Sequence, residues 1–398
     1  MNFIKFAPIK QYLHMNYIVY DDPIIRRELL PMTYTRPVGA LRIGIDTIAE
    51  KWQAFLPGEY SWDAAADYLR EIYLPCDAPD AIHIAGHIVP DRALAEAVGA
   101  LKPGECLMAG EHAVAHRGTV EKTVEYAGEV ISVTHLYDIF RLNGAVLEAD
   151  FERMTAGRTS QPLSDTNTVI GDSSRIFIEE GATVEGAFLN TKGGPIYVGA
   201  NAEIMEGSMI RGGVALCEHA VVNMGTKMYG ATTLGPWCKV GGELNNVVMQ
   251  AYSNKAHDGF LGNAVIGEWC NLGAGCVASN LKNDYSPIRL WNYPTAHFLR
   301  TGLQFCGLIM GDHSKAGINT MFNTATVVGV GVNIHGAGFP RNFVPSFVEG
   351  GSSMGFSEVS MTKFFEIARR MMSRRHKELT EADERMFYAI REAAESFK

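Results

Sequence analysis

Residues 198–240 read VGANAEIMEGSMIRGGVALCEHAVVNMGTKMYGATTLGPWCKV, and an apolar residue recurs in this stretch at every sixth position. The members of the series are Val198, Ile204, Ile210, Leu216, Val222, Met228, Leu234 and Val240. A helix repeats every 3.6 residues and a half-buried strand every 2, so neither produces this spacing. A hexapeptide repeat does, because each six residues form one short strand and turn of a triangular coil with the apolar residue pointing inward. The stretch therefore predicts a left-handed parallel β-helix.

The same spacing returns later in the chain, and it sets the limits of the predicted β-helix. One run is Phe260, Ile266, Leu272 and Ala278, and another is Met310, Ala316, Phe322, Val328 and Ile334. We expect the β-helix to occupy residues 169–345, with an insertion at 280–305. A charged, amphipathic helical tail follows over 346–398.

The chain before the repeats has a different pattern. Strand-like and helix-like segments alternate, which is typical of an α/β layered domain. We expect this domain over residues 1–134, with 1–14 as an extension before a first strand at 17–20. A helical linker over 135–168 joins it to the repeats.

Composition excludes several classes of protein. The chain has 398 residues and a net charge of −9, which argues against a nucleic-acid partner held through its phosphates. We find no apolar run of the ~18–20 residues that cross a membrane and no signal-peptide pattern at the start. The seven cysteines are odd in number and lack a CxxC pair. They favour reduced thiols and a cytoplasmic location.

Chemistry is indicated by one stretch of the repeats. Residues 253–262 read SNKAHDGFLG, residues 271–275 read NLGAG, and Asn280 follows. This stretch resembles the acetyltransferase domain of the bifunctional bacterial family that acetylates glucosamine-1-phosphate and then uridylylates the product. That family carries Lys-Ala-Gly-His, an aromatic-x-Gly pair, and Asn-x-Gly-Ala-Gly followed by Asn-Tyr. The resemblance implies acetyl-CoA as acetyl donor, a sugar-phosphate amine as acceptor, and a homotrimer.

The resemblance also assigns roles to particular residues. His257 matches the general base, which suits neutral imidazole because it accepts a proton near pH 7; a surface-loop histidine is the alternative. Asn271 and Asn280 match sugar-binding asparagines, or are turn asparagines of the coils. Lys255 and Lys227 are candidates to hold the sugar phosphate, or are solvated lysines.

Other features leave the ligands open. Leu281 stands where the family has tyrosine, and the residue before the histidine is deleted, so the acceptor sugar is uncertain. The CoA site is not defined either, and Lys315 and Arg341 are candidates. A zinc site would need three converging histidines, and no suitable pair lies beside His257, so we expect no metal in the β-helix.

The N-terminal domain resembles sugar-1-phosphate nucleotidyltransferases, with departures. Residues 29–38, LLPMTYTRPV, match the segment that follows the family's glycine loop. The glycine loop itself, whose amides cradle the triphosphate, is replaced by the sequence YDDP at 20–23, and His87 stands in place of a metal-binding aspartate. Arginines that are candidates to bind phosphate in another way, or to form surface salt bridges, are Arg26, Arg27, Arg36 and Arg42.

These observations predict an enzyme that moves acetyl from acetyl-CoA to the amine of a sugar phosphate, most plausibly glucosamine-1-phosphate. We expect uridylyl transfer from UTP, and the Mg²⁺ that it needs, to be feeble or lost. The alternatives are a nucleotidyltransferase alone and a non-catalytic β-helix assembly subunit.

Overall fold

The computed structural model describes residues 15–398, so the predicted extension at 1–14 lies outside the described residues. The chain divides into two compact units. The first holds the chain up to Arg26, Arg36–Leu41 and Thr47–Thr134, and the second holds Arg27–Thr35, Arg42–Asp46 and His135–Lys398. The boundary expected at residue 134 did not foresee that Arg27–Thr35 and Arg42–Asp46 belong to the second unit. The further boundaries at residues 168 and 345 stay a prediction.

The first unit is built on a six-stranded mixed sheet of order β2-β1-β3-β6-β5-β7. The central strand β1 (Asn16–Tyr20) is parallel to both of its neighbours, and β6 is antiparallel to β3 and β5. The other strands are β2 (Glu59–Asp63), β3 (Ile82–Ala85), β5 (Glu105–Ala109), β6 (His112–Arg117) and β7 (Lys122–Glu125), with a small ladder of β4 (Ile88–Val89) and β8 (Ile131–Ser132). The helices are α1 (Pro23–Glu28), whose last two residues belong to the second unit, α2 (Ile48–Phe55) and α3 (Arg92–Gly99).

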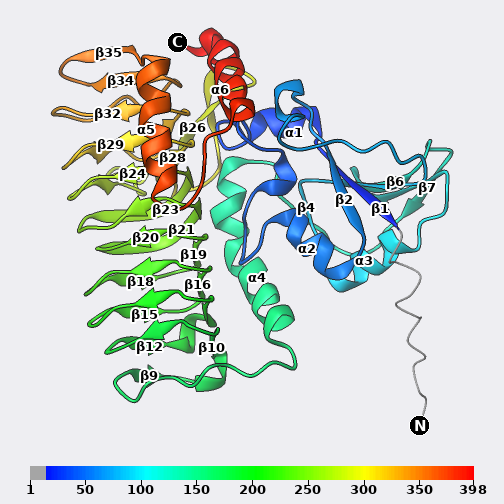
Figure 1. Ribbon diagram of the computed structural model, residues 1–398, viewed down its shortest axis with the longest axis horizontal. Helices are drawn as coiled ribbons and strands as arrows, with labels where there is room; N and C mark the ends of the chain where they lie inside the picture. The colour runs from blue at the N-terminus through cyan, green and yellow to red at the C-terminus, as the bar shows by residue number, and fades with distance from the viewer. Residues whose placement is uncertain (1–14) are drawn as a thin grey trace. The chain divides into compact units, whose positions relative to one another are not determined.

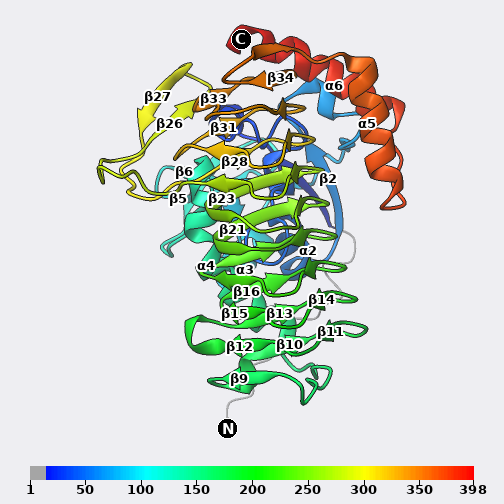
Figure 2. The same ribbon diagram turned by 90° about the vertical axis from the view of Figure 1, so that its left-hand side faces the viewer.

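The second unit is the predicted β-helix, whose coils stack from β9 to β35 (Figures 1 and 2). Its first face holds β10 (Ile176–Ile178), β13 (Ile196–Val198), β16 (Val214–Leu216), β19 (Thr232–Leu234), β28 (Ile309–Met310), β31 (Val327–Val328) and β33 (Phe343–Val344). The second holds β11 (Thr183–Val184), β14 (Glu203–Ile204), β17 (Val221–Val222), β20 (Lys239–Val240), β22 (Asn254–Lys255), β24 (Asn271–Leu272), β29 (Lys315–Ala316), β32 (Asn333–Ile334), β34 (Val348–Gly351) and β35 (Gly355–Glu358). The third holds β9 (Thr168–Ile170), β12 (Phe188–Asn190), β15 (Met209–Arg211), β18 (Lys227–Tyr229), β25 (Val277–Ala278) and β30 (Met321–Phe322).

Two long strands turn the corner between faces. The first part of β21 (Glu243–Ala251) pairs with β18 on the third face, and its last part pairs with β19 on the first face. The next long strand, β23 (Phe260–Glu268), follows β21 along the same path. These strands lie in the coils that flank His257.

Burial follows the hexapeptide series, which confirms the predicted fold class. All eight apolar residues of the opening stretch are at most 1% exposed and belong to one core cluster. One member of the later series is wrong: Phe260 is half-buried and points outward, and Leu261 fills the core. Leu261 lies six residues after the inward Lys255, and the step that is one residue short is the next one, from Leu261 to Ile266, where β23 turns from the third face to the first.

Helices cover two of the three faces. The linker helix α4 (Leu136–Thr155) packs Leu147 and Phe151 against Phe177 and Tyr197 of the first face. Beyond the last coils, α5 (Met361–Ser373) and α6 (Glu381–Ala394) join an aromatic cluster through Phe364. The insertion forms a hairpin of β26 (Arg289–Asn292) and β27 (His297–Arg300). Within residues 15–398 we find no helix long and apolar enough to cross a membrane.

Candidate functional site

His257 lies on the corner between the second and third faces. The corner follows β22 and precedes β23, and the His257 side chain is exposed. Its backbone is held from the coils on both sides. The side-chain amide of Asn223 donates to the Ala256 carbonyl (2.7 Å), and the Gly275 amide donates to the Asp258 carbonyl (2.9 Å). The corner therefore presents the imidazole to solvent from a fixed backbone.

Lys255 lies inside the coil, which corrects its predicted role. It pairs with Val240 in the inward column of the second face and is 0% exposed. Its ammonium donates to the carbonyls of Gly241 (3.2 Å), Asp258 (3.1 Å) and His257, and burial lowers its pKa. All three donors are used by the protein, so Lys255 is not available to a sugar phosphate in this structure. It instead ties down the two carbonyls of the corner that carries His257.

The two predicted asparagines lie at different places on the coils. Asn271 points outward on the second face, one coil beyond Asn254, and is exposed. Asn280 follows β25 at the far end of the third face, and its side-chain amide donates to the Oδ1 atom of Asn263 (2.7 Å). That bond matches the turn-asparagine alternative. The structure thus puts Asn271 near the His257 corner and Asn280 at the opposite end of a face.

Lys227 is exposed on the third face. It pairs with Met209 on one side and Glu243 on the other. Phe260, which follows the His257 corner, lies one further coil along the same column. Binding of a sugar phosphate by Lys227 stays a prediction.

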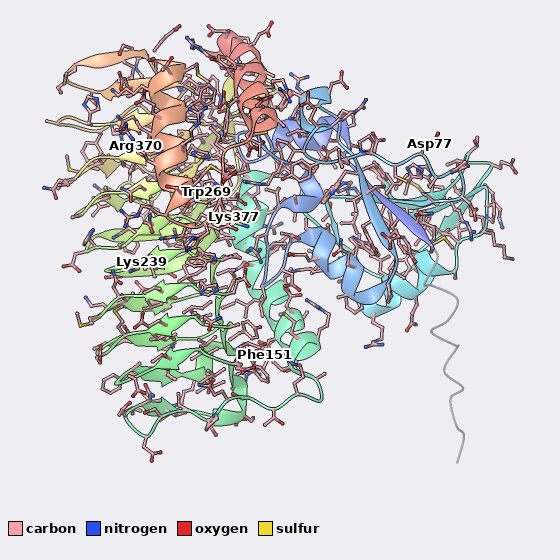
Figure 3. The ribbon with its side chains drawn as sticks, viewed as in Figure 1. Asp77, Phe151, Lys239, Trp269, Arg370 and Lys377 are labelled. Carbon is pink, nitrogen blue, oxygen red and sulfur yellow. The ribbon has the colours of Figure 1, made fainter. Side chains whose placement is uncertain are left out.

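A pocket of about 570 Å³ lies between the second face and α5. Figure 3 labels Lys239 and Trp269 on the coils and Arg370 on α5, which runs alongside them. The lining residues are Lys239, Tyr252, Asn254, Ala256, Trp269, Asn271, Lys315, Ile367, Arg370, Met371, Arg374 and Arg375. The pocket therefore reaches the residue before His257 and includes Asn271. Arg341, the other candidate for CoA, lines a separate pocket beside the insertion hairpin.

An aromatic ladder at the next corner of the coils was missed from the sequence. Trp237, Tyr252 and Trp269 occupy equivalent left-handed positions, with φ of 61°, 54° and 59°. The Tyr252 and Trp269 rings stack at 4.2 Å with 3° between their planes. Each residue falls three positions after an inward apolar residue of the first face, so the hexapeptide series contains the signal for this ladder.

The four candidate arginines are divided between the two units. Arg26 donates to the Tyr68 hydroxyl (2.7 Å) and lies 4.0 Å from Asp21, and Arg36 is also buried in the first unit. Arg27 is exposed and belongs to the second unit. Arg42 is also in the second unit, where its guanidinium donates to the carbonyls of Gln250 (3.2 Å) and Ile45. The donors of Arg42 are therefore taken by the protein, which corrects its predicted role in binding phosphate.

The carboxyl end of β1 shows what replaces the glycine loop. Asp21 accepts from the amides of Val38 (2.7 Å) and Ala65 (3.2 Å), and burial raises its pKa. Asp22 accepts from the amides of Ile24 (2.8 Å) and Ile25 (3.1 Å). Where a glycine loop would offer free amides to a triphosphate, the two carboxylates at this end of β1 accept from backbone amides of the chain itself.

The same end of the sheet does not fit Mg²⁺. His87 is buried, burial lowers its pKa to about 4, and both ring nitrogens lack a hydrogen-bond partner within the described residues. Mg²⁺ prefers oxygen ligands, whereas His87 offers nitrogen and both carboxylate oxygens of Asp21 accept from backbone amides. Across residues 15–398 no group of three or more histidine, cysteine or acidic side chains is placed to hold a metal ion.

Fold and site together define a hexapeptide-repeat β-helix preceded by a nucleotidyltransferase-like α/β unit. Residues 17–159 match the family described as sugar nucleotidyl transferase. The chain is 23% identical over 227 residues to the bifunctional protein GlmU of Synechococcus elongatus, and equally to that of a second Synechococcus strain. Over this part of its length it is thus similar to the GlmU-type bifunctional proteins, in agreement with the family resemblance stated from the sequence.

The similarity covers only part of each protein. The alignment includes 51% of this chain and 46% of the relatives, so the chain spans about half the length of the curated proteins that it matches. Among solved structures, the UDP-N-acetylglucosamine acyltransferase of Francisella novicida aligns with 57% of this chain and 87% of its own, at 10% identity and a TM-score of 0.28. The Arabidopsis UDP-N-acetylglucosamine acyltransferase aligns with 59% and 93%, at 12% identity and a TM-score of 0.21.

Proposed function

We propose that this protein transfers an acetyl group from acetyl-CoA to the amine of a sugar phosphate, with glucosamine-1-phosphate as the first acceptor to test. The observation that carries the proposal is the corner at 256–259. It exposes an imidazole on a backbone held by Lys255, Asn223 and the next coil. The relationship to GlmU-type proteins supports the same reaction class.

His257 acts as general base in this proposal. The amine nitrogen of the sugar attacks the thioester carbonyl carbon while neutral imidazole accepts the proton that the amine loses. The C–S bond then breaks, and CoA leaves as its thiolate, which takes up a proton. Lys255 contributes by positioning, because its bonds to the His257 and Asp258 carbonyls limit the movement of the corner. Asn271, outward on the next coil, is available to bind the sugar.

We also propose a homotrimer in the cytoplasm. The third face leaves apolar side chains exposed at its outward positions: Phe188, Met209, Val277 and Met321. Phe188 pairs with Met209, and Val277 with Met321, so one column along the face carries two exposed apolar pairs, separated by Lys227, Glu243 and Phe260. Exposed apolar pairs on a flat sheet face are typical of a surface that a second copy of the chain covers. The His257 corner borders this face, so a neighbouring copy would lie beside it.

The direct test measures transfer of isotope-labelled acetyl from acetyl-CoA to glucosamine-1-phosphate by the purified protein. His257→Ala should lower kcat by about 10²–10⁴-fold, the usual contribution of a general base. The KM for the sugar should change little, because the base acts mainly in the transition state. His297→Ala removes an exposed histidine from the insertion hairpin and serves as the matched control.

The outcomes separate the alternatives. Near-normal turnover of folded His257→Ala would discard the assignment of the base. If the wild-type protein acetylates no amine and binds no CoA in calorimetry, the non-catalytic assembly subunit becomes the better description.

A further inference from the structure

The pocket beneath α5 gathers positive charge from two separate elements. Lys239 and Lys315 project from the second face, and Arg370, Arg374 and Arg375 come from α5 and the residues directly after it. Among the described residues, no aspartate or glutamate lines the pocket. Five cations thus face one cavity of about 570 Å³.

Two of the arginines differ in how their charge is balanced: within residues 15–398, Arg375 lacks a partner at one nitrogen, whereas Arg370 forms an ion pair. The Nε atom of Arg375 is buried and has no hydrogen-bond partner within the part of the chain that the structure describes, although its guanidinium lies 5.6 Å from the Trp237 ring centre. Arg370 is 3.4 Å from Glu366 of its own helix, at the exposed surface. Cations held close together repel one another, so an anion in the pocket would be stabilised by all of them at once.

The remaining lining residues suit an organic ligand. The stacked rings of Tyr252 and Trp269 form an aromatic wall, and the side chains of Asn254 and Asn271 supply hydrogen-bonding groups. A volume of this size lies in the range of small-molecule sites, which is roughly 300–1,000 Å³. Arginine binds phosphate oxygens with two parallel N–H bonds, and lysine binds them as a point charge.

We propose that this pocket binds the diphosphate group of an organic ligand. Five cations exceed what a single phosphate requires, and they come from both walls of the cavity, so two linked phosphates can be held between them. This chemistry has two sources, a coenzyme such as CoA and a nucleoside diphosphate or its sugar conjugate. If the ligand is CoA, the pocket holds the acetyl donor and this proposal rests on the proposed function; if it is a nucleoside diphosphate, the pocket is a separate site. In both cases the pocket lining excludes His257, so binding can be measured independently of transfer.

Titration calorimetry on the purified full-length protein tests the proposal with four probes: CoA, UDP, pyrophosphate and inorganic phosphate. We expect at least one of the first three to bind more tightly than inorganic phosphate. Arg374→Gln and Arg375→Gln should each weaken that binding by about tenfold or more, as expected when a charged phosphate contact is lost. Lys377→Gln removes the same charge two residues beyond Arg375, outside the lining, and should change affinity less than twofold.

The other outcomes are decisive as well. Binding of CoA without UDP, or of UDP without CoA, identifies the source of the diphosphate. No binding of any diphosphate at millimolar concentration overturns the proposal, and so does an equal loss in Lys377→Gln. Because Arg375 also packs over Trp237, Lys239→Met tests the opposite wall without touching that contact. His257→Ala should bind the same ligand normally, so loss of transfer and loss of this site are distinguishable.

Discussion

Lys315 offers a sharp test of the electrostatics of the α5 pocket. It points outward on β29 between Asn271 and Asn333 of the neighbouring coils and is partly buried. Its ammonium donates to the His313 carbonyl (2.8 Å). Burial lowers the pKa of Lys315 from 10.5 to about 8, against a smaller opposing effect of the Cys270 thiol. The folded protein therefore holds this proton less tightly than the unfolded chain does.

The lowered pKa can be converted into a stability effect. One pKa unit corresponds to about 1.4 kcal/mol, so the charged form of Lys315 costs the folded state about 3 kcal/mol, or roughly 2 kcal/mol after allowance for its remaining exposure. Below pH 8 the lysine is charged in both states and the cost is complete. Between pH 8 and 10.5 the unfolded chain binds more protons than the folded one, so wild-type stability rises with pH.

The perturbation is Lys315→Met, which keeps the length of the side chain and removes the charge. About three quarters of this stability effect is recovered by pH 10, so we expect the melting temperature of the variant relative to wild type to fall by about 3–6 °C as the pH rises from 7 to 10, at ~2–4 °C per kcal/mol for a unit of this size. Loss of the bond to the His313 carbonyl adds an offset that does not vary with pH. Differential scanning calorimetry at a series of pH values measures the difference, which cancels the titration of all other groups.

Lys377→Met is the control, because that lysine is exposed beyond the end of α5. Its difference from wild type should stay constant over the same pH range. A constant difference for Lys315→Met as well would refute the reasoning, since it would mean that the charge of Lys315 is not penalised by its surroundings.

Three further predictions follow from the fold and the sites. The protein should release no appreciable pyrophosphate from UTP and N-acetylglucosamine-1-phosphate, because the glycine loop is missing and Asp21 and Asp22 place carboxylates on backbone amides where it would lie; robust release would disprove this. Met209→Asp should convert the proposed trimer to smaller species in light scattering by placing charge on the third face, whereas Met354→Asp, on the exposed turn before β35, should leave the mass unchanged. Leu261→Ala should lower the free energy of unfolding by about 2–5 kcal/mol, because it truncates a buried side chain. Phe260→Ala should lower it far less when both variants are made in the Met209→Asp background, where contacts between copies do not contribute. Equal losses in denaturant-induced unfolding would contradict the register of β23.

The β-helix could be predicted from the sequence because its information is local. Every coil repeats the same inward position, so a spacing of six between apolar residues is enough to define it. The error at Phe260 arose where a corner changes length, since the series then restarts with a different offset. Met249, Lys255 and Leu261 are six residues apart, and this spacing already places Lys255 in the core column. The family motif instead suggested that the charge of Lys255 binds the sugar phosphate.

The sites that depend on contacts between distant segments of the chain could not be predicted from the sequence. Arg42 was assigned to the N-terminal domain, but its partner is Gln250, more than two hundred residues away. The α5 pocket has the same origin, because Arg374 reads as an ordinary charge on an amphipathic tail until the helix is placed against Lys239 and Lys315.

A β-helix face is periodic, so a lysine or an asparagine on one coil resembles its neighbours on every other coil. What distinguishes one position on such a face is the element that packs over it. The segment after residue 346 therefore helps to form a site: α5 covers one stretch of the second face and places arginines beside it. Substrate choice in this protein should accordingly depend on the C-terminal helices as well as on the repeat motif, and changes at Arg374 and Arg375 should alter ligand preference while the coils stay intact.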